Sequence, residues 1–141
     1  MSEFFDALND KHVEMIGKQP VFFVATAAKD GLINLSPKGY DAFRVLSPKR
    51  VGYLDLGGSG NETHAHLSVD GRITFMFCAF EGAPNIMRLY GRGQVMQFND
   101  PGFADEIAQF PPGHERARDI IFADITAVQD SCGWAVPFSP V

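Results

Sequence analysis

Most apolar residues of this chain fall in short β-rich runs, which turn-forming residues separate. Lys29-Asp30-Gly31 between two such runs is typical of a hairpin turn, and Ser47-Pro48-Lys49 ends another run. The runs follow one another without strand–helix–strand alternation, so the pattern predicts antiparallel pairing. We expect strands over residues 21–27, 32–35, 43–46, 50–55, 72–80, 86–98 and 120–128.

Three segments have a helical pattern instead. Phe5, Leu8, His12 and Ile16 recur at spacings of three and four residues, which predicts an amphipathic helix ending near Gly17. We expect His12 to be a face or boundary residue of that helix. Two further helices are predicted over residues 62–69 and from 99 to about 110, before a Pro-Pro-Gly break.

Two features predict irregularities in the sheet. Pro37 cannot donate a ladder hydrogen bond, so we expect Ser36–Gly39 to interrupt the sheet. Gly91 and Gly93 lie inside a long strand and predict a bend or bulge. Together the elements predict a single domain over residues 1–141, built as an antiparallel barrel or strongly curled sheet with helices covering its ends.

The segment from Leu56 to Leu67 begins with a glycine-rich loop and continues into a predicted helix. Glycine N–H groups and a helix N-terminus suit a phosphate, and three side chains there offer hydroxyl or amide groups: Ser59, Asn61 and Thr63. The segment has neither Walker spacing nor a dinucleotide fingerprint. An ordinary glycine-rich turn with a polar helix cap explains the same residues.

Composition narrows the possible classes of protein. The 141 residues are 45% hydrophobic and 21% charged, which is typical of a globular domain. The net charge of −5, without a basic run, argues against a nucleic-acid partner. No long apolar run or signal sequence is visible, so we expect no membrane partner and a cytoplasmic location. Two cysteines make no disulfide framework, and 13 phenylalanines predict a dense core, an aromatic pocket or a subunit interface.

Four short segments, taken in order, resemble the split-barrel flavoproteins related to pyridoxamine 5'-phosphate oxidase. They are Asn34-Leu35-Ser36-Pro37-Lys38-Gly39, the stretch from Asp55 to His66, the stretch from Arg72 to Gly91, and Ser131-Cys132-Gly133-Trp134-Ala135-Val136-Pro137. The resemblance covers roughly residues 15–138. It implies a mainly β fold, a six-stranded antiparallel Greek-key split barrel with a few peripheral helices.

The same resemblance implies a homodimer with one FMN in each of two interfacial clefts. It places the FMN phosphate at Ser59–Thr63, and it implies that Lys38 and Arg88 bring positive charge to the phosphate or a donor to the ring. Ser36 and Lys38 would run along the flavin ring, and Trp134 of the other subunit would stack near it. The implied cofactor-binding residues are Ser36, Lys38, Gly39, Asp55, Ser59, Gly60, Asn61, Thr63, Arg88 and Trp134.

This sequence departs from the oxidase itself at two places. The oxidase grips phosphate with consecutive Arg and Lys residues where this chain has Asn61, Glu62 and Thr63, so Glu62 must point away or cap its helix. No counterpart of the oxidase's Arg-x-His substrate motif follows near the C-terminus. The resemblance therefore implies a flavin without implying oxidation of vitamin B6 phosphates.

Each implied site residue also has a structural explanation. Lys38 is equally well explained as an exposed turn lysine, and Arg88 as a strand residue in a salt bridge. Asp55 could cap the glycine loop through an Asx turn, and Trp134 could seal the core or a dimer interface. His64 and His66 are two apart on a helix and point in different directions, so no metal site is predicted.

We therefore expect an FMN-dependent oxidoreductase that moves a hydride between flavin and a small organic substrate. No Ser-His-Asp or Cys-His arrangement is visible, and no catalytic side chain is assigned. The alternatives are a non-catalytic flavin-binding or electron-transfer protein, a haem-handling split barrel that uses His64 or His66, and a cleft that holds deazaflavin or no cofactor.

Overall fold

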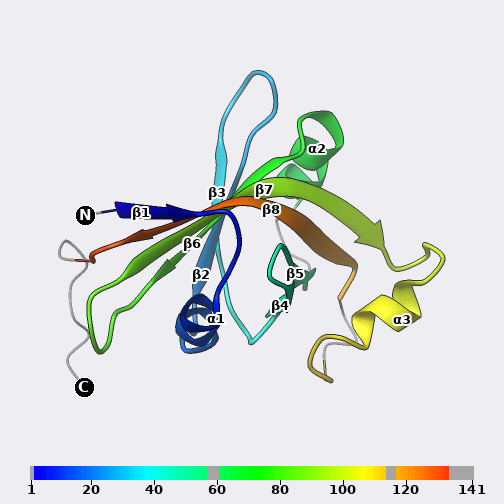
Figure 1. Cartoon of the computed structure of the whole chain (residues 1–141). Helices are drawn as coiled ribbons and strands as arrows, with labels where there is room; N and C mark the ends of the chain where they lie inside the picture. Colours follow the sequence, from blue (N-terminus) through cyan, green and yellow to red (C-terminus); the bar gives the residue numbers. More distant parts are fainter. Residues whose placement is uncertain (1, 57–60, 114–116, 134–141) are drawn as a thin grey trace.

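The computed structural model describes residues 2–56, 61–113 and 117–133, which form a curled antiparallel sheet with helices at its margins (Figure 1). Its helices are α1 (Asp10–Gly17), α2 (Asn61–Val69) and α3 (Phe103–Ile107). Its strands are β1 (Ser2–Phe5), β2 (Phe22–Thr26), β3 (Asn34–Lys38), β4 (Phe43–Ser47), β5 (Arg50–Asp55), β6 (Arg72–Cys78), β7 (Ile86–Gln97) and β8 (Asp119–Ser131).

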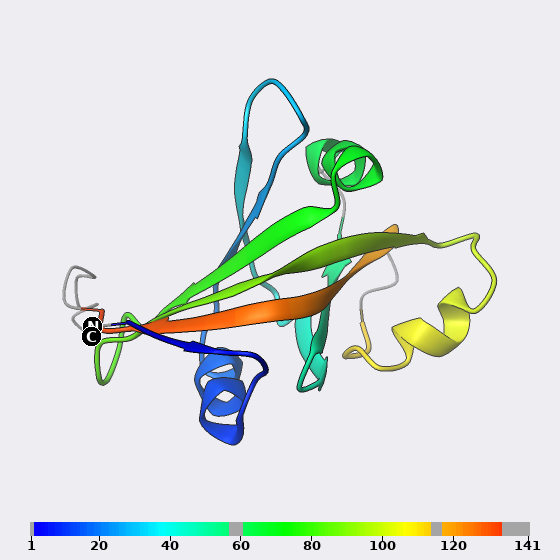
Figure 2. The same cartoon turned by 45° about the horizontal axis from the view of Figure 1, so that its top comes forward.

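The strands of the described residues join in one sheet of eight, in the order β3-β2-β6-β7-β8-β5-β4, with β1 added beside β8. Neighbouring strands are antiparallel throughout. The predicted mainly β, antiparallel class is therefore confirmed, with eight strands where six were expected. The β2–β3 hairpin projects beyond the rest of the sheet beside α2 (Figures 1 and 2).

The sheet has two chemically different faces, because side chains alternate along a strand. One face, here called the barrel face, carries a row of fully buried residues across four paired strands: Val24, Phe75, Leu89 and Val128. The opposite face, here called the outer face, carries residues that are half-buried in this single chain. Across β2, β6 and β7 these residues are Phe23, Ala25, Thr74, Met76, Arg88 and Tyr90.

Aromatic rings fill the barrel interior. Phe22 and Phe43 have ring centroids 5.1 Å apart, and Phe43 meets Phe75 at 5.3 Å and Phe77 at 5.0 Å. Tyr53 packs edge-on against Phe22 and Phe75. Much of the phenylalanine content therefore serves the core. A second, smaller core lies where α3 and the segment after it cover β5 and β8, through Leu54, Phe110, Ile120 and Phe122.

The N-terminal segment differs from its prediction. The helix expected from Phe5 begins only at Asp10, because residues 2–5 form β1 along β8, with Phe5 opposite Val128. Phe5 packs on the barrel core from that strand position. The apolar spacing of Phe5 and Leu8 thus reflects the packing of both side chains against the core, although only the residues from Asp10 onward are helical.

Three other boundaries also differ. Pro37 lies inside β3 opposite Phe23, so Ser36–Gly39 does not break the sheet; β3 is an edge strand, where a missing N–H is tolerated. Asn99–Gly102 is a turn, which shortens the third predicted helix to Phe103–Ile107. β8 runs from Asp119 to Ser131 because it pairs with β1, β5 and β7. None of the described helices is long and apolar enough to cross a membrane.

His12 is a buried structural residue and not a boundary residue of α1. Its side chain is 2% exposed, and its Nδ1 accepts a hydrogen bond from the Asn9 N–H at 3.1 Å. The Asn9 side chain in turn accepts from the His12 N–H at 2.9 Å, which completes a reciprocal cap. Nδ1 must be unprotonated to accept this bond, so the cap requires neutral imidazole.

We expect stability to fall as the pH is lowered below about 6.5, because of His12. Burial lowers the pKa of His12 below its ordinary value of 6.5, although Asp130 partly offsets this. The unfolded chain then binds more protons than the folded chain, so this stabilisation is present above 6.5 and is lost as the pH falls through the folded pKa. Urea unfolding from pH 8 to 5 measures the effect. His12→Gln, which keeps an acceptor but does not titrate, should flatten the profile; an equally steep profile would contradict the assignment.

Candidate functional site

Helix α2 is held against the sheet by polar contacts from its barrel side. Asn34 on β3 donates from Nδ2 to the Thr63 hydroxyl at 3.0 Å, and the Thr26 hydroxyl on β2 meets His66 Nδ1 at 3.0 Å. Asn34 also donates to Thr26 at 3.3 Å, so one network joins two strands and the helix. Apolar contact adds to this at the far end, where Leu67 packs over Gly93. The start of α2 is therefore fixed beside β3.

Tyr53 extends this network into the barrel. Its side chain is 1% exposed and its hydroxyl hydrogen-bonds Thr63. Burial raises the pKa of Tyr53 far above its ordinary value, and the nearby charge of Asp55 raises it further. The phenol is therefore neutral at any physiological pH. Thr63, itself 4% exposed, has both Tyr53 and Asn34 as partners, so its hydroxyl serves the interior.

Ser36 and Lys38 lie on β3 and follow Asn34 on the same face. Ser36 is opposite Val24 and Lys38 is opposite Phe22, both buried in the barrel. Ser36 and Lys38 are only half-buried, because β3 is at the edge of the sheet. Gly39 follows directly, and a Cβ there would lie 3.0 Å from the Pro20 carbonyl oxygen. The structure thus brings Asn34, Ser36 and Lys38 to the edge against which α2 begins.

Arg88 lies on the other face of the sheet. It is opposite Met76 on β6 and Gln129 on β8, between the buried Met87 and Leu89. Within one chain the sheet therefore separates Arg88 from Ser36 and Lys38. Lys38 and Arg88 of the same chain therefore lie on opposite faces of the sheet.

Asp55 belongs to a polar cluster at one end of the barrel. It is 6% exposed, faces Asp119 directly in the β5–β8 pairing, and accepts from Arg118 Nη2 at 3.4 Å. Burial raises the pKa of the Asp119 carboxyl, and Asp55 raises it further, whereas His64 and Arg118 lower it. His64 Nε2 lies 3.1 Å from Gln97 Nε2, which ties α2 to the end of β7. Asp55 therefore lies at the end of β5, where the segment that leads to α2 begins.

The remaining predicted site residues are described only in part. Ser59, Gly60 and Trp134 lie outside the described residues. Asn61 is the first residue of α2, and Glu62 in the same turn is exposed. His64 and His66 have ring nitrogens in contact with Gln97 and Thr26. Among residues 2–56, 61–113 and 117–133, no three His, Cys, Asp or Glu side chains gather as a metal site would require.

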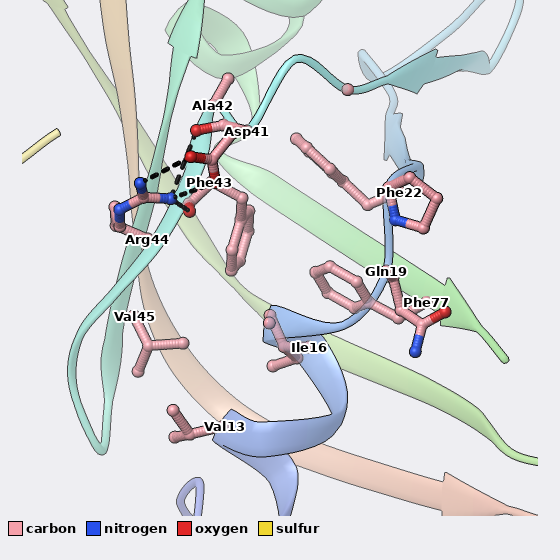
Figure 3. A pocket seen from close by; sticks show the side chains of 13 residues that line it. Val13, Ile16, Gln19, Phe22, Asp41, Ala42, Phe43, Arg44, Val45 and Phe77 are labelled. Carbon is pink, nitrogen blue, oxygen red and sulfur yellow. Dashed lines mark hydrogen bonds and ion pairs between the residues drawn. The ribbon is translucent and has the colours of Figure 1, made fainter. Parts of the chain in front are cut away.

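An apolar pocket of about 230 Å³ opens between α1, β2 and β4 beside Gly39 (Figure 3). Ile16, Phe22, Phe43 and Phe77 point into it. Arg44 lies at its margin and binds Asp41 through both carboxylate oxygens, at 2.8 and 3.0 Å. The pocket is small and mainly apolar, so it suits a compact apolar group better than a whole cofactor.

Sequence reasoning missed three residues that position α2. Asn34, Tyr53 and His66 form its network. Asn34 and His66 lie in the motif segments but were not assigned as site residues, and Tyr53 lies outside those segments. A polar residue at a barrel-facing strand position was the available signal for Asn34, since its neighbours on that face, Thr26 and Val24, are buried. Nothing in local sequence pairs Tyr53 with Thr63, because the contact joins two elements across the fold.

The antiparallel curled sheet with its few helices is a split-barrel fold, and comparison with known proteins supplies the family. The model of the pyridoxamine 5'-phosphate oxidase family matches residues 8–131. The family protein ustO of Aspergillus flavus is 44% identical over 141 residues, which cover 97% of this chain. The chain therefore belongs to the pyridoxamine 5'-phosphate oxidase family. It spans only 57% of the length of ustO.

Solved structures show the same fold at low sequence identity. A variant of HupZ from Group A Streptococcus has a TM-score of 0.69 at 19% identity, over 87% of this chain and 98% of that chain. An FMN-binding protein from Syntrophomonas wolfei has a TM-score of 0.57 at 12% identity, over 82% of this chain and 79% of that chain.

Proposed function

We propose that this protein is a homodimeric FMN-binding oxidoreductase that acts on a small organic substrate. The observation that carries the proposal is the edge site itself. In this chain, the N-terminus of α2 is held against β3, the strand that presents Asn34, Ser36 and Lys38. The chain also belongs to the oxidase family. The FMN-binding protein from Syntrophomonas wolfei, which shares the fold, supports the choice of cofactor.

The described residues suit the phosphate end of FMN. Helix α2 has nine residues, and its first-turn N–H groups together with the helix dipole attract an anion. Lys38 supplies a cation from the neighbouring edge, and Ser36 supplies a hydroxyl. Thr63 would act by anchoring the helix to Asn34 and Tyr53, because its hydroxyl is already used there. Exposed Glu62 can turn toward solvent.

The separation of Lys38 from Arg88 supports a dimer with the cofactor between subunits. Lys38 is on the barrel face and Arg88 on the outer face, so both reach one cofactor only if it contacts Lys38 of one subunit and the partner subunit's Arg88. The part of the outer face around Arg88 is suited to such contact. Phe23 and Met76 lie in the same row and are half-buried, and Leu35 on the neighbouring edge strand is 67% exposed.

Bound FMN would supply hydride transfer, and the chain would hold and shield it. Lys38 and Ser36 would orient it from one edge, and Asp55 would support the turn into α2. Tyr53 stays neutral behind Thr63, because burial and the nearby charge of Asp55 raise its pKa. No side chain of the site is assigned a proton-transfer role.

The purified protein should be yellow or take up added FMN, and mass measurement of the compound released on denaturation should identify FMN. Colourless protein that fails to bind FMN would exclude the proposal. A Soret band would indicate the haem alternative. Anaerobic bleaching of the flavin by a substrate distinguishes an oxidoreductase from a flavin carrier.

Lys38→Gln should weaken FMN binding about tenfold while changing riboflavin binding less than about twofold, because only FMN carries the phosphate. Titration with quenching of flavin fluorescence measures both ligands. Lys29→Gln, at the exposed hairpin turn, is the matched control and should change neither. Equal loss of both flavins in Lys38→Gln would show that Lys38 does not face the phosphate.

A further inference from the structure

A second groove lies on the outer face, away from the barrel-face site. Its volume is about 520 Å³, within the size range of small-molecule sites. Ala25, Ala27 and Ile33 form its apolar wall on the β2–β3 hairpin, and Thr74 and Tyr90 form its floor. Arg72 and Arg92 stand at one end.

The two arginines of this groove are directly opposite in the β6–β7 pairing. Like charges at directly opposed positions destabilise a sheet, so the arrangement needs a compensating anion. Asp70 provides one carboxylate, whose Oδ1 accepts a hydrogen bond from Arg72 Nε at 2.5 Å. The backbone carbonyl oxygen of Asp70 accepts a hydrogen bond from Arg92 Nη1 at 2.8 Å. Asp124 lies opposite Arg92 on β8 but pairs with Arg50 at 2.7 Å. Three arginines in this row thus face two carboxylates, and the end of the groove carries a net positive charge.

Donors are still available at that end. Within the described residues, both terminal nitrogens of Arg72 and the second terminal nitrogen of Arg92 make no further hydrogen bond. The Asp70–Gly71 turn, with Gly71 at φ +83°, holds Asp70 against the strand ends. Arg92 Nη1 lies 3.7 Å from the ideal Cβ position of Gly71, so the guanidinium lies directly against this turn. Planar guanidinium groups suit carboxylate and phosphate oxygens in particular.

We infer that this groove is an anion subsite, in which Arg72 and Arg92 bind the carboxylate or phosphate of a small ligand whose apolar body lies along Ala25, Ala27 and Ile33. Thr74 adds a hydroxyl between the two ends. The role of this ligand as substrate rests on the proposed function, whereas its binding does not. The inference narrows the substrate class to organic anions with a compact apolar group.

Calorimetric titration with phenyl phosphate tests the subsite, with phenol and inorganic phosphate as partial probes. Phenyl phosphate should bind more tightly than either probe. The double substitution Arg72→Gln with Arg92→Gln should weaken it at least about tenfold, since each charge-assisted contact is lost. The matched control is Lys11→Gln with Lys18→Gln, which removes the same two charges from exposed positions in α1 and at its C-cap, outside the groove. An equal loss of phenyl phosphate affinity in the control would show that only the net charge of the protein matters, and it would overturn the inference.

Two further measurements distinguish the loss of this subsite from a loss of folding and from a loss of the cofactor site. The melting temperatures of the double variant and the control should agree, and Arg72→Lys, which keeps the charge, should retain part of the affinity. FMN and riboflavin affinities should be unchanged in the double variant. Selective loss of FMN there would make the groove the cofactor's own phosphate site and overturn its assignment as a separate subsite. If FMN does not bind the unmodified protein but phenyl phosphate does, the proposed function fails while the anion subsite stands.

Discussion

Gly91→Ala is expected to lower the free energy of unfolding by about 3 kcal/mol or more, the upper range for forced overpacking. A Cβ at Gly91 would overlap the backbone carbonyl oxygen of Asp124 and come within 3.0 Å of its carbonyl carbon. These are backbone atoms of the paired strand β8, so no side-chain rotation relieves the overlap. The register shift between Tyr90 and Gly91 lies at this point, where the two longest strands bend together.

Urea unfolding followed by circular dichroism measures this loss. Gly17→Ala is the matched control, because an added Cβ there meets nothing within 4 Å and the residue ends a helix. We expect that substitution to change stability by no more than about 0.5 kcal/mol. A Gly91→Ala protein as stable as the control would mean that β7 and β8 can separate locally without cost, contrary to the pairing described.

Thr63→Val should cost about 2 to 3 kcal/mol and should loosen α2 more than the rest of the fold. Valine has nearly the volume of threonine, so packing is preserved while the hydroxyl is removed. The buried Tyr53 hydroxyl and the Asn34 amide then lose their shared partner. Because these bonds fix the start of α2, we also expect weaker FMN binding without any direct contact between Thr63 and the phosphate.

Urea unfolding gives the stability change, and amide hydrogen exchange along α2 reports the local loosening. Thr63→Ser keeps the hydroxyl and should recover most of the stability. Ser68→Ala is a second control, since Ser68 is exposed and bonds only the Ala65 carbonyl within the described helix. Unchanged protection of α2 in Thr63→Val would show that the polar network does not hold the helix.

More of the fold than of the candidate site could be predicted from the sequence. The hairpins, the bulge at Gly91 and helix α2 follow from local patterns that the sequence displays directly. The helix boundary at Phe5 could not be predicted, because both a helix and a strand would place Phe5 against the core. Pro37 was misread for a related reason: whether a strand lies at an edge depends on its neighbours, not on its residues.

For the site, the motif segments named residues that the fold brings to one edge of the sheet, but they did not reveal how those residues contact one another. Asn34, Ser36 and Lys38 share one edge with the start of α2, as the segments implied. Thr63 resembles a ligand residue in sequence, yet its hydroxyl faces Tyr53 and Asn34 inside the fold. Arg88 resembles a partner of Lys38, but strand alternation places the two on opposite faces.

The sequence by itself determined the antiparallel class, the order of the elements and the family, because periodicity, turn chemistry and motif order are local properties. Tertiary structure alone decided which polar groups meet. The Tyr53–Thr63 contact, the opposed Asp55 and Asp119, and the opposed Arg72 and Arg92 each join residues from different elements. Their chemistry depends on strand register, and a shift of one residue would move every side chain to the other face.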